Sequence, residues 1–509
     1  METPIFDFVD RYIEGGAARL HVPGHKGRGS FGIEARDITE IAGADALYEA
    51  EGIIAESEKN AAGLFGSAAT FYSCEGSSLC IRAMLYLALV NRERGAEAAV
   101  SAERPVALAA RNAHKAFLYA AALCDFDVEW LFPEADSDAD LNAVGECLEL
   151  YGQIGFNSRC ACPVTPAGLA ARLQAMAVKP FCVYVTSPDY LGGMQDIAGL
   201  SRVCRAFGVP LLVDNAHGAY LKFLPQSRHP IDLGADMCCD SAHKTLPALT
   251  GGAYLHISKG ADWRHVEGAR GALSLFGSTS PSYLILQSLD LCNASLAEEF
   301  PARLAAAANR VAALKRRLSA RGFHVLPGEP MKLTLAGDGF SLADRLRAGG
   351  VECEYADRNH AVLMFAPDNS EVDYARIERA LNSAKNPQAC AAKGRHTRRA
   401  AGTGEKSTRR SVISPARAMT IREAMFAPSE VIPVREALGR VCAAPAVACP
   451  PAIPIAVSGE VISEATVSAF LSNGIEAVRV VSRADGIAIP PFVTGEPAAR
   501  CADSSLRSR

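Results

Sequence analysis

The sequence "SAHKTLPALTGG" (residues 241–252) directly follows the apolar run "DMCCD" (236–240). Such a run is typical of a buried strand, so Lys244 is predicted to lie just past the end of one. A lysine ammonium is costly to bury unless it is paired with an anion or changed chemically. Lys244 is therefore the first candidate for a functional residue, and the pattern around it indicates the fold.

Short apolar runs alternate with helical patterns on both sides of this motif. The runs "FCVYV" (181–185), "PLLVD" (210–214) and "AYLHI" (253–257) are apolar on both faces, as in strands inside a parallel sheet. The segments "TPAGLAARLQAMA" (165–177) and "DIAGLSRVCRAFG" (196–208) carry the start and stop signals of helices. Strand, helix and strand joined by short connections predict an α/β fold with a largely parallel sheet.

The pattern changes in the second half of the chain. An Ala-rich segment, "NASLAEEFPARLAAAANRVAALKRRLSARG" (293–322), predicts one long helix, and short strand-like runs follow it up to residue 367. These elements indicate a smaller α+β domain. The segment 385–413 is basic, poor in large apolar residues and rich in Gly, Ser and Thr, so we interpret it as a linker to a third unit.

Composition excludes several classes of protein. With 509 residues, 49% of them hydrophobic, the chain can bury large cores, and a net charge of -4 provides no global positive field for nucleic acid or anionic lipid. We find no signal-peptide pattern and no apolar stretch of about 18 residues, so we expect a cytoplasmic protein without a membrane span. The 16 cysteines are scattered and form no Cys-x-x-Cys pair, so we expect reduced thiols and no metal site.

Two further motifs place polar groups beside predicted elements. Gly76, Ser77 and Ser78 begin a helix that is apolar almost all round, where free N–H groups and hydroxyls can bind a phosphate, although Gly-Ser-Ser is also an ordinary helix cap. Asp214 ends the strand in "LLVDNAHGAY" (211–220), at the edge where open α/β sheets bind ligands, although it could equally cap the next helix. A phosphate cradle, a carboxylate and a buried lysine are together what pyridoxal phosphate (PLP) requires, because the lysine forms a Schiff base and the carboxylate keeps the pyridine nitrogen protonated.

Several longer motifs carry a resemblance to a known family. The chain resembles the fold-type-I ornithine/lysine/arginine decarboxylases, in the compact bacterial branch without an N-terminal wing domain. The C-terminal stretch 421–460 is similar to the C-terminal domain of that family, which a generic aminotransferase lacks. The motifs that carry the resemblance are "RLHVPGHKG" (19–27), "EGIIAESEKNAAGLFGSAATFY" (51–72), "RNAHKA" (111–116), "VTSPDYLG" (185–192), "LLVDNAHGAY", "SAHKTLPALTGG" and "STSPSYLILQSLD" (278–290).

The resemblance implies a PLP-dependent transferase-like fold of the aspartate aminotransferase type. The large domain then has a mainly parallel sheet and is joined to a small α+β domain and a C-terminal α+β decarboxylase domain. The predicted boundaries are 1–60 for an N-terminal arm, 61–290 for the PLP-binding domain, 291–384 for the small domain, 385–413 for the basic linker and 414–509 for the C-terminal domain.

The resemblance also implies roles for individual residues. Lys244 becomes the Schiff-base lysine, Asp214 binds the pyridine nitrogen and His114 stacks on the ring, with Lys244 or His243 as the proton donor. The implied cofactor-binding set is Gly76, Ser77, Ser78, His114, Ser187, Asp214, His217, Ser241, His243 and Lys244. Glu75 departs from the family, where an Asn is common in the phosphate turn, and the segment 135–163 is longer than the family's connection there.

The implied reaction is the PLP-dependent decarboxylation of a basic amino acid to its amine and CO2, a step of the kind used in polyamine biosynthesis. We expect arginine or lysine rather than ornithine as substrate, with Glu51, Asp45 or Glu75 as candidates to bind the side-chain cation. The arm around "HVPGHKG" (21–27) is expected to reach the active site of a partner subunit, so we expect a homodimer or a higher even oligomer. Two alternatives remain: another PLP enzyme such as an aminotransferase or a carbon-sulfur lyase, and a catalytically silent PLP-binding regulator, against which the intact Lys244 and Asp214 argue.

Overall fold

The computed structural model describes residues 1–92, 104–133, 160–382, 415–445 and 451–483. The predicted linker at 385–413 and most of the segment 135–163 lie outside these ranges. Within them, no helix is both long and apolar enough to cross a membrane. The cysteines that the structure describes are free thiols, as expected.

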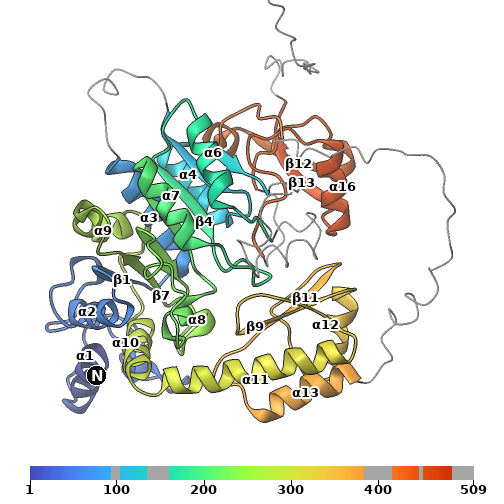
Figure 1. Ribbon diagram of the computed structural model, residues 1–509. Helices are drawn as coiled ribbons and strands as arrows, with labels where there is room; N and C mark the ends of the chain where they lie inside the picture. Colours follow the sequence, from blue (N-terminus) through green and yellow to red (C-terminus); the bar gives the residue numbers. More distant parts are fainter. Residues whose placement is uncertain (93–103, 134–159, 383–414, 446–450, 484–509) are drawn as a thin grey trace, which may run out of the picture.

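A seven-stranded sheet forms the centre of the large domain (Figure 1). Its strands lie in the order β1-β7-β6-β5-β4-β2-β3. All neighbouring pairs from β3 to β6 are parallel, whereas β7 pairs antiparallel with both β6 and β1. The strands are β1 (Ala69–Ser73), β2 (Val106–Ala110), β3 (Asp127–Leu131), β4 (Cys182–Thr186), β5 (Leu211–Asp214), β6 (Met237–Asp240) and β7 (Ala253–Ile257).

Helices cover both faces of this sheet, as the strands with two apolar faces predict. On one face, Val183 and Val213 pack in a cluster with Leu169 and Leu200 from α6 and α7. On the other face, Leu212 belongs to a larger cluster that includes α3, α4 and α9. The helices of this part are α1 (Pro4–Glu14), α2 (Ile53–Phe65), α3 (Gly76–Val90), α4 (Lys115–Cys124), α6 (Pro166–Ala175), α7 (Ile197–Phe207), α8 (Ala242–Thr245), α9 (Trp263–Phe276) and α10 (Tyr283–Ala297), and the short 3-10 turns are Glu34–Arg36, Leu47–Glu49 and Ala219–Phe223.

The predicted helix signals act as expected in α6 and α7. The Thr165 side chain accepts a hydrogen bond from the backbone N–H of Gly168, and the Asp196 side chain accepts one from that of Gly199, so each satisfies an otherwise unpaired donor at a helix start. Gly208 ends α7 in the left-handed conformation, with φ of 63°. The strand predictions around this region are confirmed to within one residue at their starts and ends.

The prediction of one long helix over 293–322 is wrong. The structure has two helices there, α10, which ends at Ala297, and α11 (Phe300–Ala320). Pro301 is the physical reason, because proline has no N–H to donate and is tolerated only in the first turn of a helix, where the structure places it.

The remaining elements form two smaller sheets. The four-stranded antiparallel sheet has the order β10-β11-β9-β8 and lies beside α11 and α13, which run along each other (Figure 1). The two-stranded sheet β12-β13 lies in the C-terminal part, where the backbone carbonyl of Ala122 in α4 accepts a hydrogen bond from Arg422 of α15. These elements are β8 (His324–Leu326), β9 (Lys332–Ala336), α12 (Gly339–Ala348), β10 (Tyr355–Ala356), β11 (His360–Met364), α13 (Glu371–Asn382), α15 (Ile421–Phe426), β12 (Ser429–Pro433), the 3-10 turn Val434–Glu436, α16 (Glu464–Ser472) and β13 (Ala477–Val481).

Candidate active site

A cavity of about 400 Å³ opens at the carboxyl ends of β4, β5 and β6. Asp214 ends β5, and Lys244 lies in the short helix α8 that follows β6. Because β5 and β6 are neighbouring parallel strands, both side chains lie at the carboxyl ends of the strands. Of the predicted cofactor-binding residues, Gly76, Ser77, Ser78, His114, Asp214, His217, Ser241, His243 and Lys244 line the cavity.

Lys244 projects into the cavity, and its amine contacts a histidine. Its Nζ lies 3.1 Å from Nε2 of His217, which is buried. Burial lowers the pKa of the Lys244 ammonium, whereas the nearby carboxylates of Asp214 and Glu354 act in the opposite direction. A lysine with a lowered pKa has more of its amine in the free, nucleophilic form.

Asp214 is held by hydrogen bonds on both oxygens. Its Oδ1 accepts from the backbone N–H of Ala216 at 3.1 Å, and its Oδ2 accepts from the hydroxyl of Tyr184 at 3.1 Å. Asp214 is only 3% exposed. The carboxylate therefore has one orientation, fixed before any ligand binds.

The phosphate cradle predicted at the start of α3 is joined to the lysine motif. The Ser241 hydroxyl donates to that of Ser77 at 2.8 Å. Gly76 has φ of 69°, and its N–H donates to the backbone carbonyl of Gly251 at 2.7 Å. A Cβ at Gly251 would lie 2.7 Å from the carbonyl oxygen of Cys74, so only glycine lets the two turns approach this closely.

Two of the three histidines that line the cavity, His114 and His243, are held in definite tautomers. His114 precedes α4, and its Nδ1 accepts from the N–H of Ala116, so Nε2 carries the proton of the neutral ring. Burial lowers the pKa of His114 to about 4, which keeps the ring neutral near pH 7. His243 has its Nδ1 2.9 Å from the carbonyl of Gly252, which can only accept, so Nε2 of neutral His243 is an acceptor.

Some predicted residues lie elsewhere or are engaged differently. Ser187 is buried next to the site but does not line the cavity, and its hydroxyl accepts from the N–H of Gln195. Glu75 lines the cavity, and its carboxylate accepts from the N–H of Ser278 at 2.6 Å. Asp45 accepts from several backbone N–H groups around the start of α2, and Glu51 is exposed away from the cavity lining.

The cavity also has lining residues that sequence reasoning missed. Glu354, just before β10 of the small domain, faces the cavity, and its carboxylate accepts from the hydroxyl of Tyr190 at 2.5 Å. Pro451, Ala452 and Ile453 come from the C-terminal part, where the carbonyl of Ala452 accepts from the N–H of Lys115. Only folding brings these segments to the site, since they lie more than 100 residues from Lys244 in sequence.

A buried polar network lies next to the lysine motif, at the end of β6. Asp240, next to Ser241, accepts from Nε2 of His229 at 3.0 Å and of His256 at 3.3 Å, and its other oxygen accepts from the Asn215 amide at 2.7 Å. Cys238 lies beside them, so the cluster could formally hold a metal ion. The hydrogen bonds to Asp240 already engage His229 and His256, which fits a structural role for both histidines.

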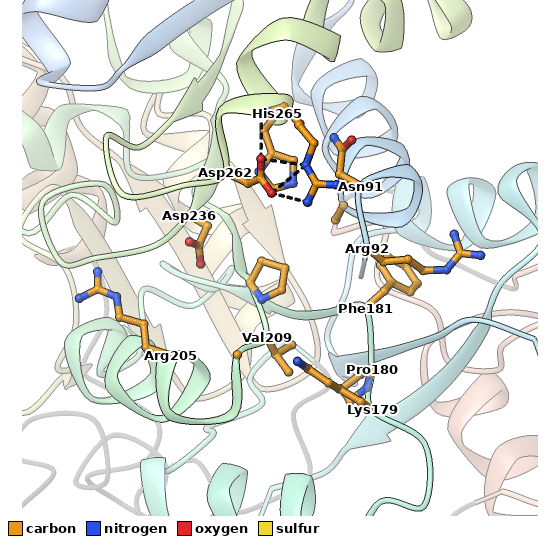
Figure 2. Close-up of a pocket in the computed structure, with 14 residues that line it drawn as sticks. Asn91, Arg92, Lys179, Pro180, Phe181, Arg205, Val209, Asp236, Asp262 and His265 are labelled. Carbon is orange, nitrogen blue, oxygen red and sulfur yellow. Dashed lines mark hydrogen bonds and ion pairs between the residues drawn. The ribbon is translucent and has the colours of Figure 1, made fainter. Parts of the chain in front are cut away.

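A second cavity, of about 370 Å³, lies at the amino ends of β4, β5 and β6 (Figure 2). It is lined by residues that precede β4, β5 and β6, including Phe181, Val209 and Asp236. None of the predicted site residues lies there. In open α/β folds ligands bind at the carboxyl ends of the strands, so the first cavity is the candidate active site.

Comparisons with known proteins agree with this geometry. A family model described as the Orn/Lys/Arg decarboxylase major domain matches residues 3–331, and a model of the C-terminal domain of the same family matches residues 403–479. The chain belongs to the Orn/Lys/Arg decarboxylase family. The predicted family and fold class are thereby confirmed, and so is the prediction that the chain is a decarboxylase-type enzyme.

Relatives span nearly the whole chain. An arginine decarboxylase of Bacillus subtilis (strain 168) is 27% identical over an alignment of 504 positions, which covers 93% of this chain and 94% of the relative. An arginine decarboxylase of Bacillus anthracis is 25% identical over 94% of both chains. Among solved structures, the constitutive lysine decarboxylase of E. coli matches with a TM-score of 0.69 and 16% identity, over 94% of this chain and 82% of that one. The similarity to this solved structure shows that the two chains share a fold.

Proposed function

We propose that this enzyme uses PLP to decarboxylate arginine. The observation that carries the proposal is the convergence on one cavity of a lysine, a fixed carboxylate and a glycine-serine cradle, with the carboxylate of Glu354 in the same cavity. Family membership implies PLP as the cofactor and a basic amino acid as the substrate. The names of the relatives in two Bacillus species favour arginine.

The residues present fit PLP. The helix α3 begins in the cavity without a side-chain cap, so the N–H groups that follow Gly76 and the hydroxyls of Ser77 and Ser241 can bind a phosphate. Within the described part of the chain, two buried side-chain atoms of the lining, Oδ1 of Asn112 and Oγ1 of Thr186, have no hydrogen-bond partner. Buried polar groups are rarely left unpaired, which indicates a polar ligand here.

Each side chain has a role in that chemistry. When bound, PLP supplies a ring that accepts the electron pair released as the substrate carboxylate leaves as CO2. Lys244 would hold the cofactor covalently, Asp214 would hold the proton of its pyridine nitrogen, and neutral His114 would lie against its ring. Lys244 or His243 would donate a proton to the α-carbon, and neutral His243 presents an acceptor at Nε2, so it must first take up a proton.

Glu354 is the residue we assign to the cation of the substrate side chain. A guanidinium is planar and always charged, and it matches a carboxylate with two parallel hydrogen bonds. The Tyr190 hydroxyl orients Glu354 by donating to one oxygen, and Tyr190 is itself buried. Of the three acids predicted for this role, Glu75 alone lines the cavity, and its carboxylate is engaged with Ser278.

We further infer that the enzyme works as a homodimer. The N-terminal arm exposes large apolar side chains, with Leu20 at 94%, Phe31 at 88% and Val22 at 64% exposure. Apolar side chains gathered in one exposed segment are typical of an interface. A second copy related by two-fold symmetry would cover both arms equally.

The experiment is a direct comparison of three substrates. CO2 and amine release from arginine, lysine and ornithine should give the highest kcat/KM for arginine. Release from ornithine above both others would refute the assignment of the pocket, and keto-acid formation without CO2 would favour an aminotransferase.

A further inference from the structure

His217 lies between two lysine side chains from different domains. Its Nε2 is 3.1 Å from Nζ of Lys244, and its Nδ1 is 3.5 Å from Nζ of Lys332, which begins β9 of the small domain. Lys332 is 2% exposed and also donates to the carbonyl of Asp189 at 3.1 Å. No catalytic role assigned so far uses Lys332.

The burial of Lys332 is compensated by a specific partner. The carboxylate of Glu329 lies 3.7 Å from its Nζ and is 1% exposed. Glu329 is in turn fixed by the hydroxyl of Tyr220 and by the N–H of Met331. A lysine ammonium paired with a carboxylate can only donate hydrogen bonds, so Lys332 acts as a donor toward its neighbours.

That donor determines which nitrogen of His217 carries the proton. Because the Lys332 ammonium has no lone pair, Nδ1 of His217 must be the acceptor. In the neutral ring the proton then sits on Nε2 and points to Nζ of Lys244. Only the free amine of Lys244 can accept that hydrogen bond, since an ammonium would present a second donor to it.

We propose that Lys332 is a positioning residue, which sets the tautomer of His217 and thereby holds Lys244 as the free amine. The free amine is the form that reacts with an aldehyde, so the small domain prepares Lys244 for covalent attachment of the cofactor. This inference rests on the function proposed above. It assigns a role in that reaction to a residue that does not touch the cavity.

The surrounding charges are consistent with this arrangement. Burial and the positive charge of Lys332 lower the pKa of His217 well below its ordinary value, so its ring is neutral. The groups that face His217 are Lys244, Lys332, His114 and His243, together with the ring of Tyr190, and those that face Lys244 are His217, Asp214, Glu354, Lys332 and Cys239.

The test measures the protonation of Lys244 in the full-length enzyme freed of its cofactor. Acetic anhydride acetylates an amine only as the free base, so the pH dependence of labelling, quantified by mass spectrometry on the peptide with Lys244, reports its pKa. The key variant is Glu329→Gln/Lys332→Met, in which both members of the ion pair are replaced by uncharged side chains. The net charge of the pair is therefore unchanged, and comparison with a His217→Gln background separates a shift carried by the hydrogen bond to His217 from the direct effect of the Lys332 charge on Lys244.

We expect this variant to raise the pKa of Lys244 by about one unit, so that labelling below that pKa is about tenfold slower. The matched control is Lys315→Met, because Lys315 binds the backbone carbonyl of Glu329 but not His217. It should leave labelling unchanged. In a His217→Gln background the double substitution should cause a much smaller shift, because only the direct effect of the Lys332 charge on Lys244 remains.

An unchanged pKa of Lys244 in the double variant would overturn the proposal. A shift of the same size when the double substitution is made in the His217→Gln background would also overturn it. A shift in the Lys315→Met control would also contradict it, since any nearby lysine would then suffice. Labelling needs neither cofactor nor substrate, so a failure of arginine decarboxylation would be seen separately in the CO2 assay.

Discussion

Replacing Glu354 by Gln is the sharpest test of how the substrate is recognised. The amide keeps the size of the side chain and an oxygen that can accept from the Tyr190 hydroxyl, which lies 2.5 Å from the carboxylate. It removes the negative charge that a guanidinium would meet. The substitution therefore changes the electrostatics of the pocket while leaving its shape.

The size of the effect follows from the position of Glu354 at the exposed side of the cavity. Two unit charges 4 Å apart interact by about 1 kcal/mol in water and about 4 kcal/mol near a protein surface. A hydrogen bond to a charged group contributes roughly 1.5 to 3 kcal/mol. Taking the overlap of the two ranges, kcat/KM for arginine should fall by about 10-fold to 150-fold. The loss should appear mainly in KM, because the distal charge of the substrate does not change during the reaction.

The assay is the initial rate of CO2 release from carboxyl-labelled arginine over a range of concentrations. Glu352→Gln is the matched control, since Glu352 lies two residues away, is exposed, pairs with Arg347 at 3.3 Å and does not line the cavity. An unchanged kcat/KM in Glu354→Gln, or an equal loss in Glu352→Gln, would refute the assignment of Glu354.

Three further predictions concern the cofactor site. Asp214→Asn should keep the fold and part of the PLP but lose more than about 100-fold in kcat, because a neutral amide cannot hold the pyridine nitrogen protonated; near-normal turnover would remove Asp214 from this role. Ser77→Ala and Ser241→Ala should each raise the Kd for PLP by about 10-fold to 100-fold in equilibrium dialysis, since each removes a hydroxyl that can bind the phosphate dianion, and an unchanged Kd would place the phosphate elsewhere. The folded state favours neutral His114, whose pKa is lowered from 6.5 to about 4, so the stability of the cofactor-free enzyme should fall as the pH decreases through that interval. The His114→Asn variant keeps a side chain that can cap the helix but cannot titrate, so the free energy of unfolding should fall between pH 7 and pH 4 by up to about 3 kcal/mol less than in the wild type. Urea denaturation at the two pH values measures this difference. An identical pH dependence in both proteins would contradict the buried neutral ring.

The sequence was most informative where local rules decide the structure. Strands with two apolar faces predicted the central sheet, and the polar residues at strand ends predicted that Asp214 and Lys244 would meet at one edge. Both depend on short segments whose positions a parallel α/β fold fixes. The break between α10 and α11 was also readable, because Pro301 marks it, but the Ala-rich pattern on either side outweighed that signal.

Glu354 and Lys332 could not be assigned in this way. Glu354 lies in "VECEYAD" (351–357), whose charges are typical of a solvent-exposed segment, and Lys332 lies in a strand-like run where a polar residue is expected to face water. Both acquire their roles only when the small domain packs against the large one, which brings Lys332 to His217 across 115 residues of sequence. Such contacts depend on how domains dock, and no local pattern encodes that.

The role of Lys244 in PLP-dependent arginine decarboxylation is tested most directly by measuring CO2 release from carboxyl-labelled arginine with the wild-type enzyme and with Lys244→Ala, both supplied with PLP. We expect labelled CO2 and one equivalent of amine from the wild type, and no release above background from Lys244→Ala. Release at a comparable rate from Lys244→Ala, or none from a PLP-loaded wild type with arginine, lysine or ornithine, would contradict it.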